Sequence, residues 1–232
     1  MNGLEWLGLL LSFGFVFLMI ALSTLLQSLH ILGDEGARKL IHIGVAHWWI
    51  IAMIFFDDVG WVMIAPIVFI ALNYISYKKN IFSAMERSSH GDLGTVYYPI
   101  SLLLLSIITF SVSDPSPVTF GTITIPMYSY IGALGIFIMG WGDGLAAVVG
   151  KKWGKTMIRP RKSLEGTLTM LVVSFVVSYA ILSIFTPNFA ILGSVILALV
   201  ATGVEFYTAP GIDNLSVPLI TAFVYYLLTL VL

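Results

Sequence analysis

The chain has 232 residues, of which 59% are hydrophobic and only 10% are charged, and its formal net charge is −1. A soluble domain carries about 25% charged residues, so this composition indicates an integral membrane protein and excludes intrinsic disorder, which requires low hydrophobicity and high charge. The near-neutral charge argues against nucleic-acid binding, and the absence of cysteine excludes disulfides, thiolate catalysis and cysteine-based zinc sites.

Hydropathy predicts eight membrane-spanning helices, because a spanning helix needs about 20 mostly apolar residues. We expect the first to be retained rather than cleaved as a signal peptide, since its start carries Glu5 and no basic residue. The segment 186–188 (TPN) divides a long apolar run, because proline and its predecessor disfavour helix. The sequence therefore predicts one all-α transmembrane catalytic domain over 1–232. Its spans are expected at residues 4–29, 40–56, 59–77, 96–112, 129–149, 167–185, 189–207 and 215–232.

Basic residues occur only in alternate connections between these spans. The second connection holds Asp57 and Asp58, and the fourth holds Asp114. The positive-inside rule then places the odd connections in the cytoplasm and both termini outside. The sequence predicts a multi-pass protein of the cell membrane whose cationic side faces the cytoplasm. The first, third and fifth connections contain all 11 cations: Arg38, Lys39, Lys78, Lys79, Arg87, Lys151, Lys152, Lys155, Arg159, Arg161 and Lys162.

The densest polar cluster surrounds the fifth connection, in segments 140–144 (GWGDG), 150–155 (GKKWGK) and 162–166 (KSLEG). Asp143 lies within an apolar run, where an acid is costly and by default suggests function. A carboxylate suits Mg²⁺, which also bridges to substrate phosphates, and lysines suit phosphate as point charges. The pattern predicts a magnesium–polyphosphate site. Its candidate phosphate-binding residues are Lys151, Lys155, Lys162, Ser163, Gly142 and Gly144, with Glu165 as a further site residue.

Simpler interpretations of this cluster stay open. The six cations of the fifth connection are also what a topology signal and lipid-headgroup contacts require. The glycine pairs at 140/144 and 150/154 have the spacing of helix-packing motifs.

Two more connections add polar groups to the same side. Arg38 and His42 share a helix face at the entrance to the second span, with Lys39 beside them. Gly94 and Thr95 begin segment 94–99 (GTVYYP), which could wrap a phosphate, and its tyrosines could line a base or lipid pocket. The alternatives are a satisfied buried histidine, interfacial cations and an interfacial tyrosine belt.

The seventh connection adds oxygen ligands. Glu205 lies about one turn inside the end of the seventh span, where an acid is again expensive. Together with Asp213 and Asn214 it offers groups for a metal or for general-base catalysis. The alternative for Asp213 and Asn214 is a helix N-cap.

The motifs resemble those of the CTP-dependent polyprenol kinases, a family that includes dolichol, phytol and farnesol kinases and a yeast-type diacylglycerol kinase. The resemblance covers about residues 36–220. The segment 142–166 is also shared with phosphatidate cytidylyltransferases, but no Lys or Arg follows Lys162, so the arginine of their C-terminal signature is absent. The segments that carry the resemblance are 38–42 (RKLIH), 94–99 (GTVYYP), 142–150 (GDGLAAVVG), 162–166 (KSLEG) and 213–218 (DNLSVP) with Glu205 before it.

The resemblance implies transfer of the γ-phosphoryl group of CTP to the hydroxyl of a membrane isoprenoid alcohol at the cytoplasmic face. Mg²⁺ would be held by Asp143 with help from Glu205 or Asp213, and Asp213 is the candidate general base. The choice of CTP rests on the resemblance alone. Residues predicted to bind nucleotide or phosphate in addition to those of the fifth connection are Arg38, Lys39, Gly94, Thr95 and Asn214.

Two other functions remain open at this stage. A phosphatidate cytidylyltransferase would use the same site to make CDP-lipid. A transporter of an anionic solute would place polar residues at mid-membrane and on both faces, whereas this chain has them mainly on one.

Overall fold

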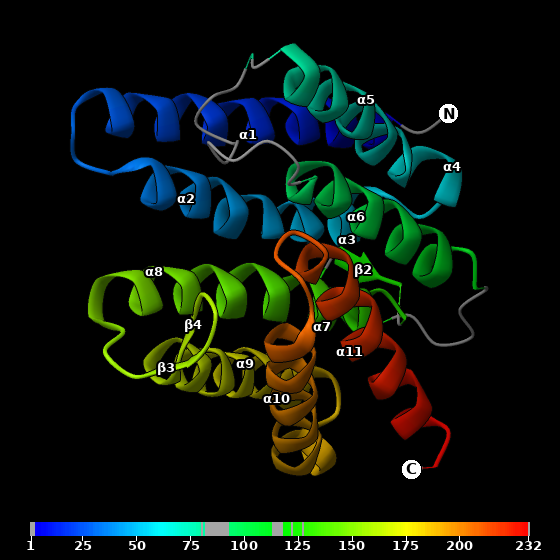
Figure 1. Cartoon of the computed structure of the whole chain (residues 1–232). Helices are drawn as coiled ribbons and strands as arrows, with labels where there is room; N and C mark the ends of the chain where they lie inside the picture. The colour runs from blue at the N-terminus through cyan, green and yellow to red at the C-terminus, as the bar shows by residue number, and fades with distance from the viewer. Residues whose placement is uncertain are drawn as a thin grey trace.

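Long helices make up most of the computed structural model, which describes residues 3–79, 81, 93–112, 118–121, 123–126 and 128–231. Figure 1 shows their arrangement. Two short antiparallel hairpins, β1–β2 and β3–β4, are the strands of the described part. In chain order the elements are α1 (Gly3–Ser28), α2 (Asp34–Ala46), α3 (Trp48–Phe55), α4 (Val59–Val62), α5 (Ile64–Lys79), α6 (Gly94–Phe110), β1 (Val118–Phe120), β2 (Ile123–Ile125), α7 (Ser129–Phe137), η1 (Ile138–Asp143), α8 (Gly144–Trp153), β3 (Met157–Arg159), β4 (Lys162–Ser163), α9 (Leu164–Phe185), η2 (Pro187–Phe189), α10 (Ala190–Tyr207) and α11 (Asp213–Thr229).

The all-α membrane architecture predicted from hydropathy is confirmed. Six helical segments of the described chain are long and apolar enough to cross a membrane. The helices α6 and α11 have 17 residues each, so the number of eight spans stays a prediction. The six segments are Gly3–Ser28, Asp34–Phe55, Val59–Lys79, Ser129–Trp153, Leu164–Phe185 and Pro187–Tyr207.

The largest differences from the predicted boundaries are at the second, fifth and sixth spans, and the fifth ends at Trp153 rather than at residue 149. The second span begins at Asp34 rather than at residue 40, because its first turns carry charged side chains that other helices contact and that hydropathy counts as loop. The sixth begins at Leu164 rather than at 167, where the Ser163 hydroxyl caps the helix by accepting from the Gly166 N–H at 3.2 Å. The predicted break at 186–188 is confirmed, since α9 ends at Phe185 and α10 begins after the short η2 turn.

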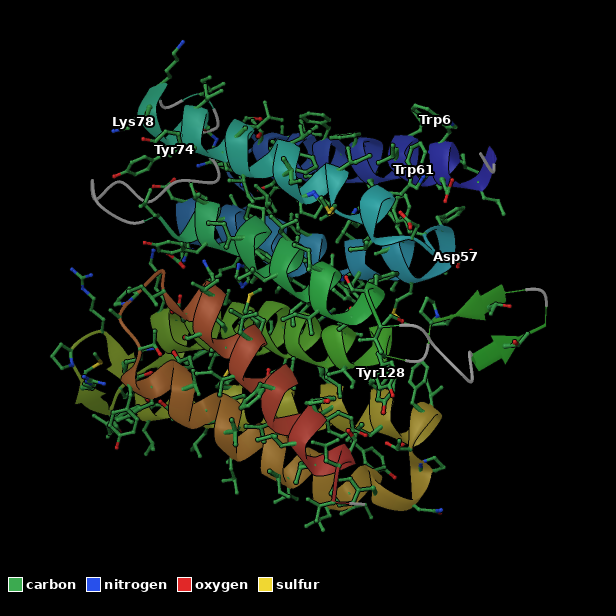
Figure 2. The ribbon with its side chains drawn as sticks, turned by 90° about the vertical axis from the view of Figure 1, so that its right-hand side faces the viewer. Trp6, Asp57, Trp61, Tyr74, Lys78 and Tyr128 are labelled. Carbon is green, nitrogen blue, oxygen red and sulfur yellow. The ribbon has the colours of Figure 1, made fainter. Side chains whose placement is uncertain are left out.

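Charged residues are segregated along the bundle. Lys78 lies at one end of the molecule and Asp57 at the opposite end, beside Trp61 (Figure 2). The connections α1–α2, α8–α9 and α10–α11 lie at the end marked by Lys78. The end marked by Lys78 also carries the acids of these connections, including Asp34, Glu165 and Asp213, and the side of the membrane that this end faces stays a prediction.

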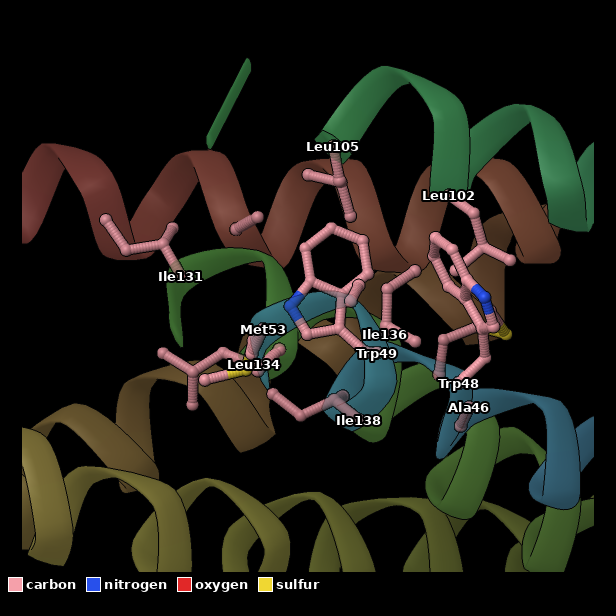
Figure 3. Close-up of a cluster of buried hydrophobic side chains, with 14 of the residues drawn as sticks. Ala46, Trp48, Trp49, Met53, Leu102, Leu105, Ile131, Leu134, Ile136 and Ile138 are labelled. Atoms are coloured by element: carbon pink, nitrogen blue, oxygen red, sulfur yellow. The ribbon is translucent and has the colours of Figure 1, made fainter. Parts of the chain in front are cut away.

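The span formed by α7, η1 and α8 is the centre of the bundle. It is 72% buried, against 22–50% for the other long spans. Figure 3 shows Trp48 and Trp49 packed between this span and Leu102 and Leu105 of α6. The Trp49 indole N–H donates to the Ser129 carbonyl at 2.9 Å. Asp143, in the middle of this central span, is therefore enclosed by protein, whereas Lys151 and Lys152 at its end are exposed.

Candidate functional site

Asp143 lies at the end of a π-helical segment inside the central span. Such segments are rare and occur frequently at functional sites. A Cβ on Gly142 would lie 2.7 Å from the Met170 sulfur of α9, and a Cβ on Gly144 would lie 2.5 Å from the Ile43 side chain of α2. These glycines let α2 and α9 approach η1 closely. The contact at Gly144 supports the helix-packing interpretation of the pair 140/144. The predicted contact of Gly142 and Gly144 with phosphate stays a prediction.

The Asp143 carboxylate is part of a buried ion pair. Lys39 Nζ donates to Asp143 Oδ2 at 2.5 Å, and His42 Nε2 lies 3.3 Å from the same oxygen. Lys39 is 2% exposed and Asp143 is 6% exposed. Lys39 is thus an internal residue of α2 and not a solvated cation of the first connection, because a lysine this deeply buried needs a partner.

Arg38 occupies the neighbouring position on α2. Its guanidinium pairs with Glu35 one turn earlier, and its Nε atom is buried without a hydrogen-bond partner among the described residues. The predicted group of Arg38, Lys39 and His42 is therefore brought together, and two of its members contact Asp143.

A second ion pair joins the β3–β4 hairpin to the end of α10. The Lys162 ammonium pairs with the Glu205 carboxylate and donates to the Glu205 carbonyl at 2.6 Å. Arg159 donates to the Phe206 carbonyl at 2.7 Å. Both cations thus satisfy carbonyls at a helix C-terminus, where positive charge is also favoured by the helix dipole. Glu205 Oε2 remains buried without a hydrogen-bond partner among the described residues.

The other predicted residues of the fifth connection have two different environments. Lys151 and Lys155 are exposed near the end of α8. Ser163 caps α9, and the Glu165 carboxylate accepts from the Thr156 N–H at 3.3 Å. Ser163 and Glu165 therefore hold the hairpin against α9, while the two lysines are available to a ligand from solution.

Asp213 and Asn214 tie the start of α11 to its surroundings. Asp213 Oδ1 accepts from the N–H groups of Gly211 and Asn214, both at 3.0 Å. The residue at the N-cap position of α11 is Ile212, and no side chain caps this helix, so the N-cap interpretation of Asp213 and Asn214 is wrong. Asn214 Nδ2 donates to the Gly94 carbonyl at 2.9 Å, and its Oδ1 is buried without a partner in the described part of the chain. The predicted segments around 94 and 214, 120 residues apart, therefore meet.

Asn73 on α5 is a site residue that the sequence did not single out. Its side-chain amide donates to the Thr95 carbonyl at 2.7 Å. Pro99 has no N–H, so it cannot supply the helical hydrogen bond that this carbonyl would otherwise accept. An amide in the middle of an apolar span was the available signal, but its partner could not be read from the pattern.

A cavity lies between α1, α2, α5, α6 and the start of α11. Its empty volume is about 670 Å³ including the opening to solvent. Polar residues line it where α2, α6 and α11 begin, and apolar residues line it further along these helices. Five buried polar atoms without hydrogen-bond partners among the described residues belong to lining residues: Arg38 Nε, His42 Nε2, Trp48 Nε1, Thr95 Oγ1 and Asn214 Oδ1. The lining residues are Val16, Arg38, Ile41, His42, Val45, Trp48, Pro66, Phe69, Asn73, Gly94, Thr95, Tyr98, Pro99, Leu102 and Asn214.

Comparison with known proteins gives the family. The chain is 33% identical over 231 residues to the phytol kinase of Synechocystis, covering 94% of this chain and 90% of that protein. The chain belongs to the polyprenol kinase family. It is 24% identical over 222 residues to phytol kinase 1 of Arabidopsis thaliana, covering 85% of this chain and 68% of that one. A dolichol kinase of Saccharomyces cerevisiae is 36% identical over 61 residues, which cover 26% of this chain and 12% of the yeast protein.

Two other comparisons return nothing. No protein-family model and no solved structure matches this member of the polyprenol kinase family. The positions of its site residues therefore follow from the packing of its own helices and not from a related solved structure.

The predicted site residues of this family member form three groups in space. Around Asp143 are Lys39 and His42, and around Glu205 is Lys162. The third group joins Gly94 and Thr95 to Asn214 and lines the cavity, as do Arg38 and His42. The tyrosines of segment 94–99 were predicted to line a pocket, and Tyr98 does so while its hydroxyl donates to the His42 carbonyl at 3.0 Å. Gly91 and Asp92, from the same predicted connection, lie outside the described residues.

The candidate metal ligands are separate carboxylates and not a cluster of ligating side chains. Within the described residues, no group of three or more His, Asp or Glu side chains could hold a metal ion. Mg²⁺ is usually held by one or two protein carboxylates together with water and substrate phosphates. The unpartnered buried Oε2 of Glu205 is an oxygen of the required kind, and η1, which carries Asp143, contacts α10, which carries Glu205. Asp143 and Glu205 therefore offer carboxylates of the kind that Mg²⁺ uses, and a magnesium ion shared by the two with a polyphosphate substrate stays a prediction.

Proposed function

We propose that the protein is a CTP-dependent lipid-alcohol kinase, which transfers the γ-phosphoryl group of CTP to the hydroxyl of a membrane isoprenoid alcohol. The observation that carries the proposal is the position of His42, which lines an amphipathic cavity and lies 3.3 Å from the Asp143 carboxylate. A hydrophobic acceptor in that cavity would have its hydroxyl beside the charged cluster. The relatives named phytol kinase and dolichol kinase support the substrate class, and the sequence motifs support CTP.

The cations of the site would neutralise the triphosphate. Phosphoryl transfer depends mainly on positioning and on stabilising charge on the transferred group. In this proposal Lys39 and Lys162, now paired with Asp143 and Glu205, turn toward phosphate oxygens when the nucleotide binds. The exposed Lys151 and Lys155 attract the nucleotide from solution.

Asp143 and Glu205 would hold Mg²⁺ in the complex, and the ion would supply charge neutralisation on the phosphates. The protein's own contribution is to keep these two carboxylates in a water-poor environment, where electrostatic interactions are strong. Asp213, the third predicted ligand, has Oδ1 engaged by two backbone N–H groups, so we assign it a supporting role at the start of α11.

The reaction is a direct displacement at phosphorus. The alcohol oxygen forms a bond to the γ-phosphorus, the bond from that phosphorus to the β–γ bridging oxygen breaks, and CDP leaves. The alcohol proton needs an acceptor. The sequence suggested Asp213 for this role. We now propose that His42 accepts this proton, because it lines the cavity beside the position expected for the hydroxyl.

The proposal also includes the orientation in the membrane. Eight spans with both termini outside would place the end marked by Lys78 on the cytoplasmic side of the cell membrane, together with the α8–α9 and α10–α11 connections. CTP would then reach the site directly from the cytoplasm, and the alcohol would reach it from the bilayer.

Turnover by the purified protein in lipid micelles tests the proposal. Farnesol, geranylgeraniol, phytol, a long polyprenol and diacylglycerol are each supplied with Mg²⁺ and γ-labelled CTP or ATP. We expect label in an extractable lipid monophosphate with CTP and at least one isoprenoid alcohol, and none with Asp143→Asn. The absence of labelled lipid with every alcohol, or transfer from ATP in preference to CTP, contradicts it.

A further inference from the structure

The cavity between α1, α2, α5 and α6 has a polarity gradient along the helix axes. At one end are Asn73, Thr95 and Asn214, and at the other are Trp48 and Leu102. On α6 the lining runs from Gly94 to Leu102, eight residues or about 12 Å. That length is less than half of the roughly 30 Å hydrocarbon core of a bilayer.

The polar end offers groups that suit a hydroxyl. Thr95 Oγ1 and Asn214 Oδ1 are buried without hydrogen-bond partners among the described residues, and Asn214 is 4% exposed. A buried polar atom without a partner is costly, which indicates that a ligand supplies the missing bond. An alcohol both donates and accepts a hydrogen bond, as the amide oxygen and the threonine hydroxyl require.

The other end is lined mainly by apolar side chains, which suit one hydrocarbon chain, and the Trp48 indole N–H is its unpartnered polar atom among the described residues. Trp48, Phe69 and Leu102 come from three helices and are 1%, 8% and 5% exposed. They contribute large buried side chains at the end remote from the polar group.

We infer that this cavity is the acceptor site, and that it takes a primary alcohol with a single hydrocarbon chain, whose hydroxyl lies among His42, Thr95 and Asn214. The chain runs along α6 toward Trp48 and Leu102, which set the length that the cavity encloses. The inference rests on the proposed kinase function for its hydroxyl chemistry. It goes further by assigning the acceptor's position, its orientation and the residues that select its length.

A second cavity is the main competitor for the chain. It is lined by residues of α6, α7 and α11, including Leu105, Tyr128 and Phe223. Tyr128 lies at the end of the molecule opposite to Lys78 (Figure 2). None of its lining residues belongs to the groups around Asp143 or Glu205. Among the described residues, the lining of this cavity has no charged group for a reacting hydroxyl, so we assign the acceptor to the first cavity.

Photo-crosslinking tests the position of the chain without requiring turnover. The full-length protein in micelles is irradiated with a farnesol analogue that carries a diazirine near the end of its chain, and the labelled peptides are identified by mass spectrometry. We expect labels at residues 45–48 and 99–102, and unlabelled farnesol should compete for them. Labels confined to 219–226, or spread without competition over lipid-facing surfaces, would overturn the assignment.

A matched pair of leucines tests length selection. Leu102→Ala enlarges the first cavity, while Leu105→Ala, the control, enlarges the second from the same helix. We expect Leu102→Ala to raise kcat/KM for geranylgeraniol relative to geraniol about tenfold, the size of effect that a methylene or more in a pocket produces, and Leu105→Ala to leave the ratio unchanged. A shift with Leu105→Ala alone, or with neither variant, contradicts the inference.

A second variant, expected to shift the ratio of kcat/KM values in the opposite direction, keeps this test informative if Leu102→Ala does not fold. Val45→Phe fills the same cavity from α2, so it should shift the ratio toward geraniol. If the wild type phosphorylates none of these alcohols, the proposed function fails, and crosslinking still decides whether the alcohol occupies this cavity.

Discussion

Lys39 of α2 and Asp143 of η1 form an ion pair that solvent scarcely reaches, although 104 positions separate them in the chain. Each residue offsets the free-energy cost of burying the other inside the helix bundle, because a buried charge without its partner is strongly destabilising. His42, at the edge of the cavity, lies 3.3 Å from the same Asp143 oxygen. Removal of the ion pair should therefore affect stability and catalysis separately.

The first prediction separates these two effects. We expect Asp143→Asn to abolish turnover and to lower the free energy of unfolding by about 3 kcal/mol, because Lys39 loses its partner. The double variant Lys39→Met/Asp143→Asn should recover most of the stability while staying inactive. Thermal unfolding in detergent and turnover measure the two quantities. An active Asp143→Asn protein would remove Asp143 from the chemistry.

The second prediction concerns two cations of the same hairpin. Lys162 and Arg159 both donate to carbonyls at the end of α10, but only Lys162 also pairs with a carboxylate, that of Glu205. We expect Lys162→Met to lower kcat roughly a hundredfold, as loss of one charge-stabilising group does, and Arg159→Met to leave kcat nearly unchanged. Equal losses in the two variants would show that Lys162 acts only by capping the helix.

The third prediction concerns the start of α6. Asn73→Leu should destabilise the protein by about 1–3 kcal/mol, because the buried Thr95 carbonyl loses its donor. Pro99→Ala restores a backbone N–H that can donate to that carbonyl, so the double variant should be less destabilised than the sum of the two single changes. Unfolding in detergent measures the cycle, and strict additivity would show that Pro99 is not the cause.

The fourth prediction concerns orientation. The chain has no cysteine, so single substitutions give clean accessibility probes. We expect Lys155→Cys to react with an impermeant maleimide only when the cytoplasmic side is exposed, and Asp57→Cys to react in intact cells. A reporter fused to the C-terminus should lie outside. Reaction of both cysteines from one side would break the assignment of alternating connections.

The sequence predicted the helices well because membrane spans are long apolar runs that hydropathy detects. The break at 186–188 was predicted because it contains a proline, which disfavours helix. Asp143 and Glu205 were also accessible to prediction, since an acid in an apolar run is expensive. Both are 6% exposed and paired with lysines.

The pairings themselves could not be predicted. The start of the second span at Asp34 was missed because Lys39 is stabilised by a distant carboxylate and not by water. Asn73 was missed because its role depends on a carbonyl that Pro99 leaves open on another helix. Such contacts depend on how helices pack, which hydropathy does not record.

Doubly labelled CTP tests the central claim most directly. The purified protein is supplied with Mg²⁺, an isoprenoid alcohol and CTP that carries one label on the cytosine and a different one on the γ-phosphorus. The account predicts a lipid monophosphate that contains the γ label and no cytosine label, with CDP released. A lipid that carries the cytosine label, with labelled pyrophosphate released, would contradict it and identify a cytidylyltransferase.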